Sequence, residues 1–428
     1  MDIESKRLSD RHSLKKLVYK VIVEVINMGL IRFCKRRAIH FSGKCISFFK
    51  KIEIKCGYQE SNEKFIANIN WDPSKKQQRV LVSYLDFGWV GERITEGATH
   101  TNLFELYPII RYFLQRDYVL DICGCNDADA ITSARKHDYD VVFGFGMVFR
   151  TLASSSNAYM ILYLTENPYY ISYQKEQERI AYFYERNHIK PELERTGIFY
   201  QKDDEKLADA IICLGHPGYV ARTGKQIIRI WPSALTSHSI PDFSSRSAKS
   251  FLVLGTDGFV HKGIDLLIET FRHHNDWNLF LCGSNLRKTL KKLKYLPLSP
   301  NIRDCGFINI YGDTFSSLAK TCTYILLPSC SEAPSTAILT GMCHGLLPIV
   351  MKGNGLDELA EYCLYFDSYD LLSIERKLQE AAQCPQSICI DRAWKVMRFA
   401  QEKFTLENFR INMEKALSDI LNQEGARG

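Results

Sequence analysis

Short apolar runs alternate with stretches of helical periodicity along most of the chain. From Arg79 onward, the apolar runs predict strands at residues 79–85, 118–122, 139–143, 158–164, 209–213 and 226–230. Apolar positions at helical spacing lie between them, notably over residues 101–115 and 172–188. Buried strands that alternate with helices are typical of a parallel sheet covered on both faces.

The same alternation begins again after a polar, serine-rich stretch at residues 232–249. The pattern now predicts strands at 250–254, 277–282, 323–327, 346–351 and 363–366, and helices at 263–273, 285–293, 314–321 and 335–344. Two such arrays joined by a hinge predict an α/β protein with two Rossmann-like domains that face a cleft. Ligands of such sheets bind beyond the carboxyl ends of the strands.

These patterns divide the chain into four segments. Residues 1–74 form a helical extension with a linker-like stretch at 57–76. The first Rossmann-like domain is expected over residues 75–245 and the second over residues 246–390. Residues 391–428 follow as C-terminal helices.

The N-terminal extension carries the basic charge of the chain. The net charge is +6, but residues 1–56 hold 14 Lys/Arg and 5 Asp/Glu, so the remainder is slightly acidic. Apolar positions at helical spacing over residues 14–33, followed by a basic and aromatic stretch, predict an amphipathic helix. This helix either docks on an anionic membrane surface or packs on the body with a solvated basic face; both interpretations stay open. Its apolar stretch, interrupted by Lys20 and Glu24, is too short to span a membrane.

Composition narrows the class of protein further. Hydrophobic residues make up 46% of the chain and charged residues 24%, which is enough apolar material for packed cores. Because the basic excess belongs to the extension, nothing indicates a nucleic-acid-binding body. The 14 cysteines include no C-x-x-C pair, so no zinc site is expected and a reducing cytoplasm is favoured. The polar start of the chain does not resemble a signal peptide.

A first candidate site follows the strand at 250–254. Gly255 and Thr256 begin a glycine-containing loop, and Lys262 and Gly263 end it where a helix starts. Glycines let the backbone approach a ligand closely, and a lysine beside a helix N-terminus can bind a diphosphate. An ordinary strand-to-helix turn with a solvated lysine is the alternative interpretation.

A second candidate site follows the strand at 323–327. Pro328 to Glu332 form a loop, and Ser335 and Thr336 open the next helix. A carboxylate at this strand end can accept hydrogen bonds from sugar hydroxyls, while free backbone N–H groups at the helix start can bind phosphate. The alternative interpretation is a glutamate that caps the helix.

Several short motifs occur in a fixed order along the C-terminal half: Lys262-Gly263, Cys305-Gly306-Phe307, Pro328-Ser329 with Glu332, and the apolar run at residues 345–350. In this order they resemble glycosyltransferase family 4, a family of the GT-B superfold. The resemblance covers about residues 250–420, and the N-terminal half matches mainly in architecture.

The resemblance implies a GT-B fold in which the first domain binds the acceptor and the second binds the donor, with Gly306 on the donor side. Lys262 would bind the diphosphate of a nucleoside-diphosphate sugar, and Glu332 would bind the donor sugar. The expected reaction is retaining transfer to a saccharide or lipid-linked saccharide. The expected role is in surface polysaccharide biosynthesis, with the protein in the cytoplasm, peripheral on the inner face of the membrane. The helices at 391–428 would cross back to the first domain. No cofactor and no metal are expected.

Two positions depart from the pattern of the family. Thr340 stands where the family has a second glutamate that contacts the ribose, and Thr256 stands where the family has an arginine. Thr340 can still hydrogen-bond a ribose hydroxyl. Without the arginine, the site lacks a side chain that binds phosphate through two hydrogen bonds. Lys262 and the start of the helix must then provide more of the diphosphate binding.

The first domain is expected to supply the acceptor side of the site. Gly88 and Gly91 lie in a glycine loop before a helix that begins near His100 and Asn102. His100 is either a catalytic site residue or a surface histidine near the helix start. Glu166 follows the strand at 158–164 and is the carboxylate expected to act at the cleft edge.

Alternatives to a working transferase remain. Thr256 and Thr340 favour a catalytically inactive GT-B scaffold or binding protein, and a GT-B sugar-nucleotide epimerase or phosphorylase fits the same fold. A nicotinamide dehydrogenase is disfavoured, because no dinucleotide fingerprint follows any first strand. Asp127-Ala128-Asp129 has the D-x-D spelling of metal-dependent transferases of another superfold, but its polar surroundings predict a solvated turn.

Overall fold

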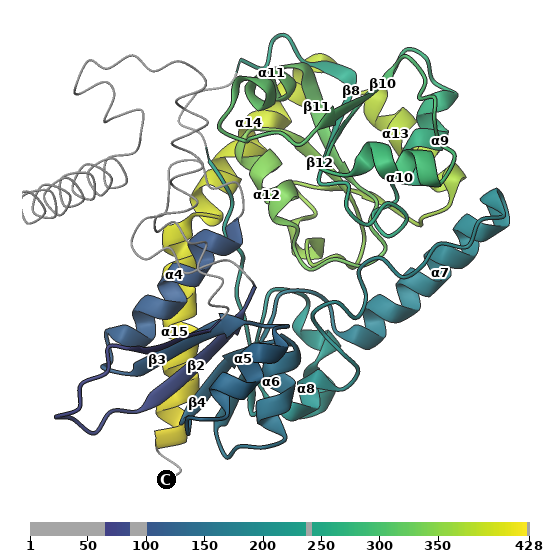
Figure 1. The fold of residues 1–428 in the computed structure, drawn as a ribbon. Helices are drawn as coiled ribbons and strands as arrows, with labels where there is room; N and C mark the ends of the chain where they lie inside the picture. Colours follow the sequence, from purple (N-terminus) through teal and green to yellow (C-terminus); the bar gives the residue numbers. More distant parts are fainter. Residues whose placement is uncertain (1–64, 86–100, 237–241, 426–428) are drawn as a thin grey trace, which may run out of the picture. The chain divides into compact units, whose positions relative to one another are not determined.

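Two sheets form the framework of the chain (Figure 1). The computed structural model describes residues 65–85, 101–236 and 242–425, which all fall within one unit that begins at Phe65. Within these residues, the first sheet has the strand order β1-β3-β2-β4-β5-β6-β7 and the second has the order β10-β9-β8-β11-β12-β13. All described pairings are parallel except that of β1 with β3.

The first sheet is built from the N-terminal half of the described chain. Its strands are β1 (Phe65–Ile69), β2 (Arg79–Tyr84), β3 (Val119–Gly124), β4 (Val141–Gly144), β5 (Tyr159–Leu164), β6 (Ala210–Cys213) and β7 (Gln226–Arg229). The helices around it are α4 (Thr101–Leu114), α5 (Ala128–Ala134), α6 (Gly146–Ala153), α7 (Tyr169–Asn187) and α8 (Asp204–Leu207). Strands β2 to β6 are almost entirely buried, as expected for a sheet covered on both faces.

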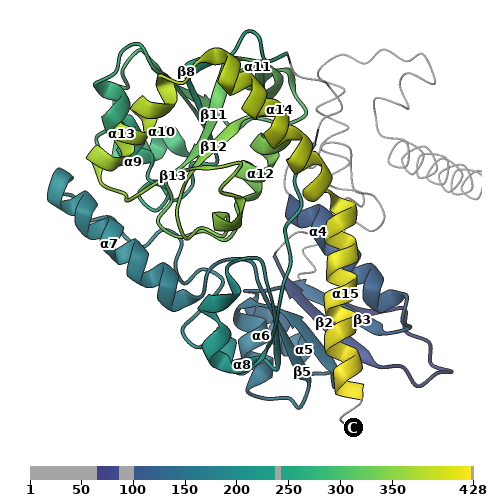
Figure 2. The same cartoon turned by 180° about the vertical axis from the view of Figure 1, so that it is seen from behind.

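The second sheet repeats this architecture. Its strands are β8 (Ser247–Leu254), β9 (Asn278–Cys282), β10 (Ile302–Gly306), β11 (Cys322–Leu327), β12 (Leu347–Met351) and β13 (Leu364–Phe366). Its helices are α9 (Ile264–Arg272), α10 (Leu286–Lys292), α11 (Asp313–Thr321), α12 (Thr336–Cys343), α13 (Leu371–Ala382) and α14 (Gln386–Lys403). Figures 1 and 2 show α12 and α14 together on one side of the sheet and α9 and α13 together on the other. The predicted fold, two Rossmann-like α/β domains, is confirmed.

Two local predictions are corrected, and one strand, β10, was not predicted. Phe65–Ile69 form β1, although residues 57–76 were expected to be a linker; the strand pairs antiparallel with β3, and its register shift obscures any regular alternation. Ile302–Gly306 form β10, an edge strand with exposed positions that carries no continuous apolar run. Asp127 does not lie in a solvated turn, because it is buried and its side chain accepts a hydrogen bond from the N–H of Asp129 at the start of α5.

The last helix returns to the first sheet. Helix α15 (Leu406–Gly425) packs beside α4, and its apolar positions Phe409, Met413, Leu417 and Ile420 join the core formed by strands β2 to β6. Helix α14, which precedes it, instead joins the core of the second sheet. The C-terminal helices therefore bury apolar surface against both halves of the chain.

Helix α7 connects the two halves through buried charges. The Arg179 guanidinium, which is fully buried, donates two hydrogen bonds to the Asp265 carboxylate of α9, at 2.7 and 2.9 Å. Arg186 pairs with Asp265 and also with Glu269 of α9. A buried guanidinium is tolerated only when its charge is paired, so α7 is anchored on the second sheet although the chain order places it in the first.

No helix of the described residues is long and apolar enough to cross a membrane. The extension, residues 1–64, lies outside the described part of the chain, as do its predicted amphipathic helix and basic stretch.

Candidate functional site

The carboxyl ends of β8 and β11 lie side by side at the centre of the second sheet. The chain continues from β8 outward through β9 and β10, and then returns to β11 and continues through β12 and β13 on the other side. This reversal makes a topological switch point, where the loops after the two strands diverge and leave a crevice for ligand. Both loops that the sequence singled out, after β8 and after β11, begin at this point.

Gly263 allows these two loops to touch. Its φ of +68° lies in the left-handed region, and a Cβ atom there would come within 2.6 Å of the carbonyl oxygen of Pro328. The N–H of Cys330 donates to the carbonyl of His261 at 2.9 Å and ties the loops together. A residue with a side chain at position 263 would force the Lys262 loop away from the Glu332 loop.

Lys262 lies over Gly255, the glycine that directly follows β8. Its Nζ atom is 3.3 Å from the position that a Cβ of Gly255 would occupy. Burial lowers the pKa of Lys262, and the negative charge of Glu332 partly opposes this effect. Among the described residues, Nζ makes no hydrogen bond and no ion pair, so a cation stands at the switch point without a bound partner.

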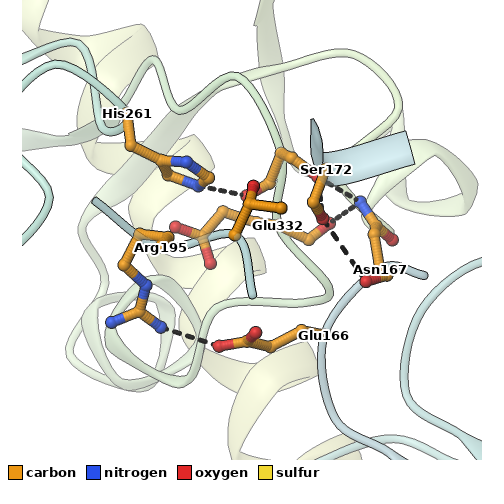
Figure 3. A pocket seen from close by; sticks show the side chains of 8 residues that line it. Glu166, Asn167, Ser172, Arg195, His261 and Glu332 are labelled. Atoms are coloured by element: carbon orange, nitrogen blue, oxygen red, sulfur yellow. Dashed lines mark hydrogen bonds and ion pairs between the residues drawn. The ribbon is translucent and has the colours of Figure 1, made fainter. Parts of the chain in front are cut away.

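Glu332 is held in place by its own loop. The hydroxyl of Ser329 donates to Glu332 Oε1 at 3.1 Å, and the N–H of Glu332 donates to the side-chain oxygen of Asn354 at 3.1 Å. Asn354 in turn donates to the carbonyl of Ser329 at 2.8 Å. The Glu332 side chain, held in this way, lines a pocket (Figure 3).

A pocket lies between Glu332 and residues of the first half of the chain. It is lined by Glu166, Asn167, Ser172, Arg195, Thr196, His261, Ser331 and Glu332. The side chains of Glu332, Arg195 and Glu166 face one another across it (Figure 3). Nearly every lining group is polar or charged, as suits a ligand rich in hydroxyl or phosphate groups.

Glu166 and Asn167 reach the pocket because they follow β5. Burial raises the pKa of Glu166, while the neighbouring charge of Arg195 lowers it. Arg195 donates a hydrogen bond of 2.8 Å to Glu166 Oε1. Asn167 donates to Ser331 Oγ and to the carbonyl of Glu332, both at 3.0 Å. It therefore links the first half of the chain to the Glu332 loop.

His261 is enclosed between α7 and the loop after β11. Its Nδ1 atom lies 3.3 Å from Glu176 Oε1, and its Nε2 atom lies 2.8 Å from the carbonyl oxygen of Ser331. Burial alone would lower the pKa of His261, but hydrogen bonds with Cys330 and Glu176 raise it well above its ordinary value. Both ring nitrogens of His261 therefore lie within reach of polar partners.

The structure brings together the central residues predicted from sequence. Glu332 and Glu166 line one pocket, and Lys262 lies beside it at the end of the β8 loop. Ser335 and Thr336 lie at the start of α12, directly after the Glu332 loop, and the Ser335 side chain caps no N–H group. Gly306 ends β10, with open space where a Cβ would be.

Other predicted residues lie elsewhere or outside the described chain. The Thr340 hydroxyl is buried and accepts the N–H of Leu235 at 3.1 Å, so it binds the segment between the two sheets; it does not line the pocket. The Thr256 hydroxyl is buried against Gly283. Asn102 lies in the first turn of α4. Gly88, Gly91 and His100 lie in residues 86–100, outside the described part.

Sequence reasoning missed six of the lining residues: Asn167, Ser172, Arg195, Thr196, His261 and Ser331. Arg195 and Thr196 lie in the irregular segment after α7, where no periodic pattern marks a position as functional. His261 directly precedes Lys262, and this adjacency was the only signal available. Within the described residues there is no group of three or more His, Cys, Asp or Glu side chains that could hold a metal ion.

Comparison with known proteins shows which family and which folds this chain is similar to. Residues 245–379 match the family model described as Glycosyl transferases group 1. The matched segment contains the loops of Lys262 and Glu332, and the fold is the predicted GT-B fold. Family 4 in particular is not distinguished by this match. Among curated protein sequences, none matches this chain.

Solved structures share the fold at low sequence identity. Sucrose-phosphate synthase from Thermosynechococcus elongatus superposes with a TM-score of 0.57 at 12% identity, over 81% of this chain and 100% of that chain. HepE from Anabaena, solved in complex with UDP and glucose, gives 0.52 at 12% identity, over 80% and 100%. WaaG, a glycosyltransferase involved in lipopolysaccharide biosynthesis, gives 0.51 at 13% identity, over 80% and 99%.

Proposed function

We propose that this glycosyltransferase moves a sugar from a nucleoside-diphosphate sugar to a saccharide or lipid-linked saccharide, with retention at the anomeric carbon as in family 4. The observation that carries the proposal is the position of Lys262 and Glu332 in neighbouring loops at the switch point of the second sheet, where Lys262 has no ion-pair partner among the described residues. HepE, which has the same fold, binds UDP and glucose. A role in surface polysaccharide biosynthesis is supported by the likeness to WaaG.

Each part of the proposed site has a physical task. Lys262 and the N–H groups at the start of α12, near Ser335 and Thr336, stabilise the negative charge of the departing diphosphate. Glu332 accepts hydrogen bonds from hydroxyls of the donor sugar. Glu166, on the opposite side of the pocket, serves the acceptor. No metal or cofactor takes part in this proposal.

The substitution Glu332→Gln tests the site. It keeps the size of the side chain and removes the charge, so we expect transfer to fall by about a hundredfold, a typical effect of losing one stabilising group. The donor is first found by a thermal-shift screen with UDP, GDP, ADP and dTDP sugars, because a bound ligand stabilises the folded state. Transfer is then measured for both proteins with that donor.

The same assay separates the alternatives. Full transfer by Glu332→Gln refutes the site. Donor binding without transfer by the wild type favours a scaffold, and a changed nucleotide sugar formed without acceptor favours an epimerase.

We further propose that residues 1–56 hold the enzyme on an anionic membrane surface at the cytoplasmic face. The support is the basic charge of this segment, with 14 Lys/Arg against 5 Asp/Glu. Deletion of residues 1–56 should release the protein from vesicles that contain anionic lipid and leave donor binding unchanged, as measured by vesicle sedimentation. Unchanged sedimentation after the deletion would favour packing of this segment on the body.

A further inference from the structure

Arg195 lies beside the loop of Lys262, although it comes from the other half of the chain. It belongs to the irregular segment between α7 and α8, and its guanidinium lines the pocket (Figure 3). Its Cγ and Cδ atoms lie 3.1 and 3.3 Å from the position that a Cβ of Gly258 would occupy. The aliphatic part of Arg195 is thus packed on the backbone of the loop that carries Lys262.

Two carboxylates fix the segment Glu194–Thr196 in this place. Glu176 of α7 accepts the N–H groups of Glu194, Arg195 and Thr196, at 2.8, 3.1 and 2.9 Å. The Glu194 carboxylate then accepts the N–H groups of Val260 and His261, at 2.7 and 2.9 Å. The segment is therefore hydrogen-bonded on one side to α7 and on the other side to the residues directly before Lys262.

Several groups that face the pocket have hydrogen-bonding capacity to spare. A guanidinium carries five N–H donors, and with the described residues the Arg195 guanidinium makes one hydrogen bond, to Glu166. Asn167 Oδ1 and Thr196 Oγ1 are buried without a hydrogen-bond partner in the described chain. Buried polar atoms are costly unless a partner satisfies them, so the pocket is built for a polar ligand.

We propose that Arg195 is a second cation of the donor site and binds the diphosphate of the nucleotide sugar together with Lys262. This inference rests on the proposed function. The planar guanidinium can bind two phosphate oxygens at once, whereas the ammonium of Lys262 acts as a point charge. Glu166 neutralises Arg195 while no donor is bound, and the Thr196 hydroxyl donates to a phosphate or sugar oxygen next to it. The donor is thus held between the two halves of the chain.

The test compares ligands with and without the diphosphate. Calorimetric affinities are measured for the nucleoside diphosphate found in the thermal-shift screen and for its nucleoside. Arg195→Gln should weaken the diphosphate about tenfold to a hundredfold, the range of a charge-assisted hydrogen bond, and leave the nucleoside unchanged. Arg195→Lys keeps the positive charge but cannot bind two phosphate oxygens at once, so its loss of diphosphate affinity should be smaller than that of Arg195→Gln. The matched control is Arg135→Gln, at an exposed position after α5.

Each outcome decides the proposal. A Gln variant that binds the diphosphate as the wild type does, yet transfers sugar more slowly, shows that Arg195 only positions Glu166, and this overturns the proposal. Equal losses for diphosphate and nucleoside, with a lowered melting temperature in both Arg195 variants, overturn it as well. The proposed function and the role of Arg195 both fail if the wild type binds none of UDP, GDP, ADP and dTDP. They also both fail if Lys262→Met binds the diphosphate as well as the wild type does. Normal diphosphate binding by Arg195→Gln alone refutes only the role of Arg195.

Discussion

The two sides of the pocket are held in place by different means. On the side of the second sheet, Lys262 and Glu332 follow neighbouring parallel strands, and the strand order brings their loops together. On the other side, Arg195 and Thr196 lie in a segment without regular structure, and the side chain of Glu176 holds its N–H groups. Sheet topology positions one side, and the carboxylates of Glu176 and Glu194 position the other.

This difference matters for how each side responds to change. Backbone pairing between β8 and β11 persists when a side chain is replaced, because each strand is bonded along its length. The segment Glu194–Thr196 has no such ladder. The second side should therefore depend far more strongly on individual polar side chains than the first.

Replacement of Glu176 should have the largest effect. Although burial opposes its ionised form, hydrogen bonds from His261 and from the N–H of Glu194 lower the pKa of Glu176 to about 2. Glu176→Ala leaves the buried His261 ring and the N–H groups of residues 194–196 without their carboxylate, and the free energy of unfolding should fall by about 3–5 kcal/mol. The measurement is chemical denaturation at pH 7.

The pH dependence of the wild type gives an independent check. Because the folded-state pKa of Glu176 lies below its ordinary value of 4.5, its stabilisation is present above pH 4.5 and is lost as the pH falls toward 2. This acid loss should be smaller in Glu176→Ala. The matched substitution on the other side is Ser329→Ala, which removes one hydrogen bond to Glu332 and should cost about 1 kcal/mol. Equal losses for the two variants would contradict the comparison.

The segment that joins the two sheets extends the comparison. The Glu105 carboxylate of α4 accepts the N–H and the hydroxyl of Ser233, at 2.6 and 2.9 Å, and Thr340 of α12 accepts the N–H of Leu235. Here too, irregular backbone is held by side chains, one from each half of the chain.

Glu105 should make stability depend on pH near neutrality. Burial raises the pKa of Glu105 to about 7, although hydrogen bonds from Ser233 lower it in part. The folded state therefore binds the proton more tightly, so this contribution is complete below pH 4.5 and is lost as the pH rises to 7, by up to roughly 3 kcal/mol. In denaturation experiments between pH 5 and 8, the free energy of unfolding of the wild type should fall with rising pH. That of Glu105→Gln should lack this fall. Thr340→Val is the control, because its cost should not vary with pH.

Much of the fold was predictable because the strands are buried on both faces. Continuous apolar runs located β2 to β9 and β11 to β13 to within a few residues. The same reasoning failed for β10 and β1, because an edge strand exposes side chains and carries no continuous run.

The candidate site was predictable only where its residues lie in motifs that follow one another in a fixed order along the sequence. Lys262 and Glu332 lie in loops with recurring motifs, whereas Arg195 reaches the pocket through contacts with Glu176 that no local pattern encodes. From the sequence, Thr256 stands where the related family has an arginine. Only the three-dimensional structure shows that Arg195 lies beside the same loop. Thr340 stands at the position of the family's second glutamate, but its hydroxyl accepts a hydrogen bond from the N–H of Leu235.

The anchoring of α7 has a consequence for exchanging domains between related enzymes. A chimera cut within residues 232–249 would take α7 from one parent and α9 from the other. Arg179 would then be fully buried without Asp265 unless the second parent carries an equivalent carboxylate. The exchangeable module is therefore the second sheet together with α7, which is discontinuous in the sequence.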